Sequence, residues 1–212
     1  MTDTDLIASL AQDLDTRQSA VAEDQKYLDG TQPLAFMSST ARDATNITRM
    51  ASNLPAVQVN AIAERLRVTA LVVGSDEKAL QSDMARNDLD QMLPLAFREA
   101  LGLGSSYAIV WDRTGSRKPT VSIESAEQVF VRRDPVTREV ASAIKRVDVG
   151  SETHAWLYLP DRVVPFKADG SGAALGWRQG KSVRNPLGVV PVVEFRNATR
   201  LLGPGVSEVE YL

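Results

Sequence analysis

The hydrophobic positions of the N-terminal region recur at the spacing of an amphipathic helix. Between residues 5 and 28 they return at intervals of three, four and seven, which places them on one stripe of a helix. These positions are Ile7, Leu10, Leu14, Val21 and Leu28. We predict that the helix ends at Asp29-Gly30, because glycine commonly follows the last helical turn and Pro33 lies just beyond. A coiled coil is the alternative, but Arg17 and Asp24 fall on its inner positions, so packing on the same chain, or loosely on a neighbouring subunit, is favoured.

A second helical pattern begins near residue 53. Asn53-Leu54-Pro55 is typical of a helix start, with asparagine at the cap and proline in the first turn. Four apolar residues at helical spacing are expected to form its buried face. They are Val59, Ile62, Ala63 and Leu66. The β-branched residues in 67–73 then predict an extended segment, an edge or a buried strand, that ends at Gly74.

Residues 75–104 return to a helical pattern, which we expect in two pieces. Ser75-Asp76-Glu77 and Asn87-Asp88 resemble helix caps, and Pro94 predicts a kink just before it. The expected buried face of the second piece is Leu89, Met92 or Leu93, Ala96 or Phe97, and Ala100 or Leu101. Gly102-Leu103-Gly104 is expected to end this helix. It does not fit a phosphate-binding loop, because such a loop follows a strand and opens a helix, and the order here is the reverse.

From residue 105 onward the pattern changes to the alternation of β-strands. Ala155, Leu157 and Leu159 share one face of a predicted strand, and Trp156 and Tyr158 share the other. Turns at short spacing separate such segments, which predicts antiparallel pairing and not a parallel sheet with crossover helices. The predicted turns lie at 113–116, 134–137, 149–151, 159–161 and 168–172. The predicted fold class is therefore α+β, with a mainly helical part at 1–104 packed on an antiparallel, turn-rich β part at 105–212.

The composition predicts a globular protein located in a cytoplasm. The 212 residues are 43% hydrophobic and include no cysteine, which excludes disulfides and thiolate metal sites. We expect neither a signal peptide nor a membrane span, because no apolar stretch approaches the roughly 20 residues that cross a bilayer. The 24 basic and 27 acidic residues give a net charge of −3, which is too near neutral for a strong nucleic-acid binder. Basic residues gather at Arg132-Arg133 and in 178–184, but Asp134 and intervening glycine dilute them, so phosphate sites are not favoured.

The candidate chemistry is sparse. His154 is the only histidine, with Glu152 two residues before it, and an exposed residue at a strand entry is favoured over a triad or metal site. Glu124, Glu127 and Asp134 lie near predicted turns, and paired carboxylates can hydrolyse glycosides, but an aromatic content of 6% offers few sugar platforms. Six other candidates lack calcium-loop spacing and are expected at caps and turns: Asp43, Asn46, Asp76, Asp83, Asp88 and Asp90. We predict no catalytic residue, no cofactor site and no metal site.

Two groups of large apolar side chains are best explained by packing. The first lies in or beside predicted strands, at the core or its rim, with an interface anchor as the alternative. It comprises Trp111, Trp156 and Trp177. The second lies in the loop at 31–41 and is expected to pin that loop to the core, with a subunit contact as the alternative. It comprises Leu34, Phe36 and Met37.

A series of short motifs, spread over residues 20–208, resembles a known family through its order along the chain. The motifs are residues 27–34, 63–68, Asn87-Asp88-Leu89-Asp90, 104–111, 157–161, Asn185-Pro186-Leu187-Gly188, 190–193 and Gly205-Val206-Ser207-Glu208. Each motif alone is weak, and the series is fairly specific. It resembles the N-terminal half of the portal proteins of tailed double-stranded DNA bacteriophages, in the subfamily common in phages and prophages of actinobacteria.

The resemblance implies a structural protein without catalytic residues. Family members form rings, usually of twelve copies, at one capsid vertex, where they serve DNA packaging, genome ejection and head-to-tail joining. The matching segment is the wing, which contacts neighbouring subunits and the major capsid protein or scaffold. We expect the stem, clip and crown to be absent because the chain stops at Leu212. Terminase and head-tail adaptor are therefore expected partners only of a full-length form.

The resemblance also implies where such a protein works. Double-stranded DNA is expected to pass through the ring without sequence-specific binding, and no membrane partner is expected. The expected location is the capsid vertex of the virion, with the host cytoplasm during assembly.

Two other functions stay open from the residues alone. A carboxylate-based hydrolase would use Glu124, Glu127 or Asp134, and requires two of them to converge within roughly 5–10 Å. A prophage-encoded adaptor or peptide-binding module would use an exposed edge strand near residues 189–195.

Overall fold

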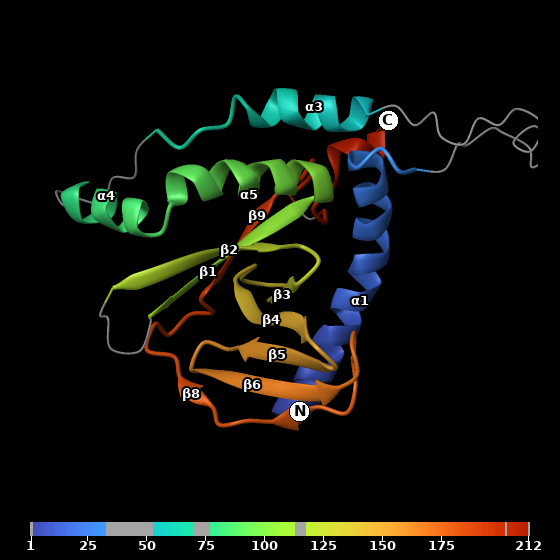
Figure 1. Cartoon of the computed structure of the whole chain (residues 1–212). Coiled ribbons are helices and arrows are strands. Elements are labelled where there is room, and N and C mark those ends of the chain that lie inside the picture. The colour runs from blue at the N-terminus through green and yellow to red at the C-terminus, as the bar shows by residue number, and fades with distance from the viewer. Residues whose placement is uncertain (1, 33–52, 70–76, 113–117, 202, 212) are drawn as a thin grey trace, which may run out of the picture.

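The helices precede the strands along the chain, and both kinds of element pack together in the computed structural model (Figure 1). The structure describes residues 2–32, 53–69, 77–112, 118–201 and 203–211. Helix α1 runs along one side of the molecule, the strands fill its centre, and α3 and α5 lie across the top of the view in Figure 1. All sheet pairs are antiparallel, so the predicted α+β class is confirmed.

Helix α1, Asp3–Leu28, starts two residues before the predicted position because of a capping box at Thr2. The Thr2 hydroxyl accepts a hydrogen bond from the Asp5 backbone N–H, and the Asp5 carboxylate accepts one from the Thr2 backbone N–H. The helix ends at Asp29, and Gly30 has a positive φ of 63°, as the sequence predicts. Its buried residues follow the expected stripe and are Ile7, Leu10, Ala11, Leu14 and Val21.

The described residues after α1 form three shorter helices: α3, Leu54–Ala63; α4, Glu77–Arg86; and α5, Leu89–Leu103. The break between α4 and α5 falls at Asn87-Asp88, as predicted, and helix α5 continues through Pro94. The buried residues of α5 agree with the predicted face and include Leu89, Leu93, Ala96, Ala100 and Leu101.

The predicted buried face of α3 is only half right. Val59 and Ala63 are buried, but Ile62 and Leu66 are exposed. The helix ends at Ala63, so Leu66 lies beyond it, while Ile62 lies within the helix beside a buried face formed by Pro55, Ala56, Val59 and Ala63. Residues 67–69 are not a strand, contrary to the prediction, and the rest of that segment lies outside the described residues. Also outside them are the turn at 113–116 and Leu34, Phe36, Met37, Asp43, Asn46 and Asp76.

A three-stranded sheet with the order β2-β1-β9 joins segments that are far apart in the sequence. Strand β1, Ser105–Asp112, pairs with β2, Pro119–Ser125, on one side and with β9, Val192–Arg196, on the other. Helix α5 covers this small sheet, and the rings of Phe97 and Phe195 meet edge to face at 5.8 Å.

A second, larger sheet has the order β3-β4-β5-β6-β7, with β8 also paired to β6. Its strands are β3, Val129–Arg133; β4, Val140–Val149; β5, Glu152–Tyr158; β6, Arg162–Asp169; β7, Arg178–Gln179; and β8, Val183–Arg184. Short connections join β3 through β6, at the turns predicted from the sequence. The chain ends in a 3₁₀ turn, Glu208–Tyr211.

The core connects α1 and the two sheets. One cluster packs α1 on the large sheet and includes Ile7, Leu10, Leu14, Ile144, Leu157, Phe166 and Trp177. A second cluster draws from both sheets and includes Tyr107, Ile109, Val129, Ala143, Val163 and Val192. Among the described helices, none is both long and apolar enough to cross a membrane.

Candidate interaction surfaces

Three aspartate–arginine ion pairs hold α1 on the large sheet. They join Asp3 to Arg162 of β6 at 2.7 Å, Asp13 to Arg132 of β3, and Asp15 to Arg146 of β4. The Arg146 side chain is only 6% exposed, so Asp15 supplies the counter-charge that a buried guanidinium requires. Arg133 pairs with Glu194 of β9 at 2.8 Å. Both arginines of the basic group at Arg132-Arg133 are therefore paired with acidic side chains of the same chain.

His154 is half-buried on β5, where the sequence predicts an exposed residue. Its Nε2 lies 3.2 Å from Glu152 Oε2, and its ring lies 6.3 Å from that of Trp156. The hydrogen bond with His154, together with the charge of Lys167, lowers the pKa of Glu152. Within the described ranges, no group of three or more histidine, aspartate or glutamate side chains could hold a metal ion.

The three carboxylates of the hydrolase alternative have separate structural contacts. Glu124 forms an ion pair with Lys145 at 2.6 Å, which links β2 to β4. Asp134 accepts hydrogen bonds from two backbone N–H groups of its own turn, which lowers its pKa. Glu127 is exposed beside α1 and lines a different hollow from Glu124. The hydrolase alternative thus gains no support from the described carboxylates.

Of the aspartates around α4 and α5 that are expected at caps and turns, Asp88 lies at a cap, and Asp83 and Asp90 lie within the end turns of helices. Asp83 pairs with Arg86 in the last turn of α4, at 2.7 Å. Asp88 is the N-cap residue of α5 and Asp90 lies in the first turn of that helix.

The three tryptophans lie in the core or at its rim. Trp177 is buried, meets the ring of Phe166 edge to face, and donates its indole N–H to the carbonyl of Ala174 at 2.9 Å. Trp111 and Trp156 are half-buried and line a hollow of about 310 Å³ between the two sheets. Packing therefore accounts for Trp177, and the other two keep part of their surface exposed.

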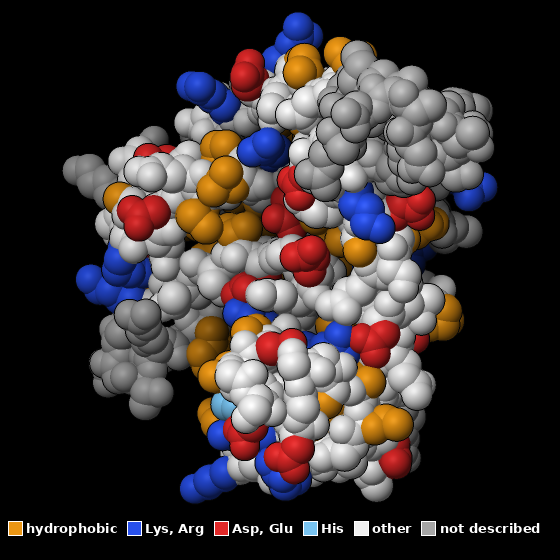
Figure 2. All heavy atoms as spheres, turned by 45° about the vertical axis from the view of Figure 1, so that its right-hand side comes forward, with side chains coloured by type: hydrophobic (Ala, Val, Ile, Leu, Met, Phe, Trp, Pro, Cys, Tyr) orange, Lys and Arg blue, Asp and Glu red, His pale blue; other side chains and the backbone are white. Residues whose placement is uncertain are grey.

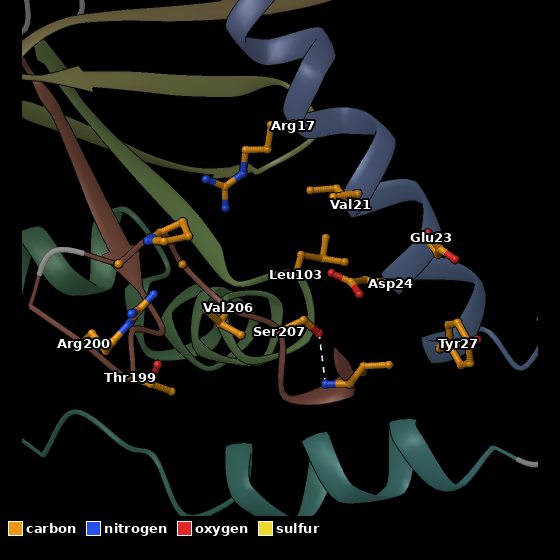
Figure 3. Close-up of a pocket in the computed structure, with 15 residues that line it drawn as sticks. Arg17, Val21, Glu23, Asp24, Tyr27, Leu103, Thr199, Arg200, Val206 and Ser207 are labelled. Atoms are coloured by element: carbon orange, nitrogen blue, oxygen red, sulfur yellow. Dashed lines mark hydrogen bonds between the residues drawn. The ribbon is translucent and has the colours of Figure 1, made fainter. Parts of the chain in front are cut away.

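A hollow of about 1060 Å³ lies between α1 and the C-terminal segment, residues 199–209 (Figure 3). Arg17 points into it from α1, and Arg200 reaches it from the C-terminal segment. Glu23 and Asp24 also line it, so both signs of charge are present. The hollow has no dominant charge that would select an ionic ligand.

A polar network that the sequence analysis missed lies beside this hollow. Arg17 donates a hydrogen bond to the Ser105 hydroxyl, which lies 3.4 Å from the hydroxyl of Tyr107. Tyr107 is fully buried, and burial raises its pKa. The signal in the sequence was Arg17 itself, a charged residue on the inner stripe of α1, which requires polar partners beneath the helix.

Several motifs that carry the family resemblance meet at the end of α5. Gly104 caps the helix with φ of 79°, and its carbonyl accepts a hydrogen bond from the Asn197 N–H at 3.0 Å. Gly205 lies directly against it, since a Cβ on Gly205 would be 2.1 Å from the Gly104 oxygen. The Ser207 hydroxyl donates to the carbonyl of Gly102 at 2.6 Å. The interpretation of the glycine pair as a helix end is confirmed.

Two asparagines of the motif series anchor loops. Asn87 bonds with backbone groups at the start of β2. Asn185 is 4% exposed, donates to the carbonyls of Leu159 and Val189 at 2.9 and 2.7 Å, and accepts from the Leu187 N–H at 3.0 Å. These contacts fix the loop before β9. From the sequence alone, an asparagine such as Asn185 indicates only a turn.

Strand β9 is an edge strand within the described sheets, as the adaptor alternative requires. It pairs with β1 on one side, and Val189 and Val193 nearby are more than half exposed. The side chain of Glu194 instead pairs with Arg133, and the ring of Phe195 packs on that of Phe97. The exposed apolar part of this edge is therefore short.

The sequence is similar to phage proteins over nearly its whole length. The family described as phage portal protein, SPP1 Gp6-like, matches residues 7–211. The portal protein of Mycobacterium phage L5 is 30% identical over 173 residues, which cover 73% of this chain and 34% of the phage protein. The portal protein of Mycobacterium phage D29 is 30% identical over 174 residues, with the same two shares. This chain spans about a third of the length of these relatives, and it belongs to the SPP1 Gp6-like phage portal protein family.

Proposed function

We propose that this chain forms the wing of a phage portal, as one sector of a ring at a capsid vertex. The observation that carries the proposal is the family match over residues 7–211, which includes nearly every described helix and strand. The role is structural: neighbouring copies and the capsid protein or scaffold are its partners, in the host cytoplasm during assembly and then in the virion. Terminase and head-tail adaptor are partners of a longer form that carries the stem, clip and crown.

The charges of the molecule support passage of DNA without tight binding. The net charge is −3, and the basic residues Arg132, Arg133 and Arg178 are neutralised by acidic partners of the same chain. Affinity for DNA depends on how many phosphates a protein neutralises, so a surface of this kind binds DNA weakly. A conduit for double-stranded DNA requires such weak contact.

A chimaera tests the proposal. The segment of the Mycobacterium phage L5 portal protein that matches this chain is replaced by this chain, and the purified protein is imaged by negative-stain electron microscopy. We expect closed rings like those of the parent protein. The parent without the matched segment is the negative control. A chimaera that is folded by circular dichroism but remains monomeric at high concentration contradicts the proposal.

The exposed edge of β9 favours one second candidate, a peptide-binding adaptor. In that case the chimaera remains monomeric, while an extended partner peptide adds a strand beside β9. Slower hydrogen exchange of the β9 amides in the presence of the peptide would then be the positive result.

A further inference from the structure

One edge of the large sheet carries a basic and apolar arm, which we define as residues 178–189. Eleven of its twelve residues are exposed, and the buried Asn185 anchors it. The arm contains no acidic residue. Its basic and large apolar side chains are Arg178, Lys181, Val183, Arg184, Leu187 and Val189. Arg178 pairs with Asp169, so Lys181 and Arg184 are the charges that the arm presents outward.

An acidic hollow of about 470 Å³ lies beside α1, between β4, the turn before β3 and Gly172 of the loop after β6. It is lined by Gln18, Ala22, Glu127, Gln128, Arg146, Val147, Asp148 and Gly172. Its one basic residue, Arg146, is buried and paired with Asp15, so Glu127 and Asp148 set the charge of the opening. Val149, the residue after Asp148 in the chain, has an exposed apolar side chain. Figure 2, which turns the α1 side forward, shows acidic side chains along the middle of that face.

The strand register places Val183 and the later part of the arm diagonally across the sheet from the hollow, while Arg178, at the start of the arm, is level with Val147 and three strand spacings away from it. Val183 of the arm pairs with Val163 of β6, which is opposite Tyr158 of β5 and, through it, Ala143 of β4. Three strand spacings separate β8 from β4, about 14 Å, and Val147 lies about 13 Å further along β4 than Ala143. Figure 1 shows β8 at the lower left and α1 at the right of the molecule. One copy therefore cannot bring its own arm into its own hollow.

A closed ring of identical copies needs this arrangement. Its contacts are heterologous, so each copy must present two different and complementary patches on opposite sides. The basic arm and the acidic hollow are complementary in charge, and both combine exposed apolar side chains with rim charges. We infer that the arm at residues 178–189 of one copy docks into the hollow beside α1 of the next copy. The inference rests on the proposed function, because it names the contact that closes the ring.

Cross-linking between labelled and unlabelled copies tests the contact directly. A carbodiimide, which joins an amine to a neighbouring carboxylate without a spacer, is added to an equal mixture of ¹⁵N-labelled and unlabelled chain. Mass spectrometry should find Lys181 joined to Glu127 or Asp148, with one peptide labelled and the other not. Cross-links that never join differently labelled copies, or that join only other residues, overturn the inference.

Charge reversal provides the second test, with association followed by sedimentation velocity and native mass spectrometry. The arm variant is Lys181→Glu with Arg184→Glu, and the hollow variant is Ala22→Lys with Glu127→Lys. Asp148 is left unchanged because its carboxylate holds the loop at residues 170–172. Each variant alone should associate at least about tenfold more weakly than the wild type. An equal mixture should recover association and form assemblies with alternating copies, since the reversed arm fits the reversed hollow.

A matched control separates this contact from a general charge effect. Arg65→Glu with Arg67→Glu makes the same charge change as the arm variant on exposed residues after α3, and should leave association unchanged. Equal weakening by this control overturns the inference, as does a mixture that fails to recover although both variants are folded. If both charge-reversal variants associate as strongly as the wild type, the docking contact is overturned, although ring formation itself is not contradicted. A monomeric wild-type chain without cross-links also overturns the contact, and the chimaera then decides the proposed function separately.

Discussion

The contact between Gly104 and Gly205 leaves no room for a side chain, which leads to a prediction at the scale of one residue. We expect Gly205→Ala to lower the free energy of unfolding by about 3 kcal/mol, because the new methyl group must displace the backbone of Gly104. Urea unfolding followed by circular dichroism measures the change. In Gly203→Ala the added Cβ would lie 3.6 Å from Arg200, an ordinary contact, so we expect a change below about 0.5 kcal/mol. Equal losses in the two variants would contradict the steric argument.

The same residues show how far single positions can be predicted. The sequence indicates that Gly104 ends a helix, because a left-handed residue after a helix is usually glycine. It does not indicate that Gly205 will lie against it, since that contact joins segments about a hundred residues apart. Arg17 shows the same limit: its place on the inner stripe of α1 signals a polar partner, but only the fold identifies Ser105. Neighbouring residues therefore determine the local backbone geometry, whereas the topology of the whole chain determines which distant residues come into contact.

At the scale of elements, the ion pairs between α1 and the large sheet should differ in strength. Asp15→Ala removes the ion-pair partner of the buried Arg146 and leaves it a hydrogen bond with the neutral amide of Gln18, and we expect this to cost about 2 kcal/mol of unfolding free energy. Asp13→Ala breaks a pair whose side chains are 34% and 40% exposed, and should cost less than about 1 kcal/mol. Urea unfolding of both variants at low and high salt measures which of them loses more unfolding free energy. The hypothesis is wrong if Asp13→Ala costs as much as Asp15→Ala.

The carboxylate of Asp148, which binds the loop between β6 and β7, should make the free energy of unfolding depend on pH. Asp148 accepts hydrogen bonds from the Gly172 N–H and from the hydroxyls of Ser171 and Thr153, which lower its pKa in the folded protein. A lowered pKa stabilises the fold above the ordinary carboxyl value, and this contribution is lost as the pH falls through the folded pKa. Asp148→Asn should therefore lose less unfolding free energy than the wild type between about pH 6 and pH 3. Parallel curves for the two proteins over that range would refute this role.

The elements differ in how well their patterns predict them. The stripe of α1 and the buried face of α5 follow from apolar spacing, because each helix lies with one side on the core. The same argument fails for part of α3: the helix ends before Leu66, and Ile62 lies within the helix but outside its buried face. Alternation and turns predict antiparallel hairpins, but not that β9 crosses back to pair with β1. Pairing between distant strands depends on the packing of the whole chain.

At the scale of the whole molecule, the two sheets form one body. Ion pairs join them at two places, Arg133 of β3 to Glu194 of β9 and Lys145 of β4 to Glu124 of β2. Apolar residues of both sheets share one cluster. Both proposed docking patches lie on the large sheet, whose strand pairing keeps them at a fixed angle, as the closure of a ring requires.

The shared core also predicts that the helical and β parts cannot fold apart, although the sequence changes character at residue 104. Helix α1 contributes Ile7, Leu10 and Leu14, all fully buried, to the core of the large sheet. Burial of such side chains is worth roughly 1.5–3 kcal/mol each, and their sum of about 5–9 kcal/mol approaches the whole stability of a typical domain. We expect fragment 105–212 alone to show the poorly dispersed amide NMR spectrum of an unfolded or aggregated chain, and an equal mixture with fragment 1–104 to recover dispersed signals. A dispersed spectrum from fragment 105–212 by itself would show that the sheets need no helix, and would place a true domain boundary at residue 104.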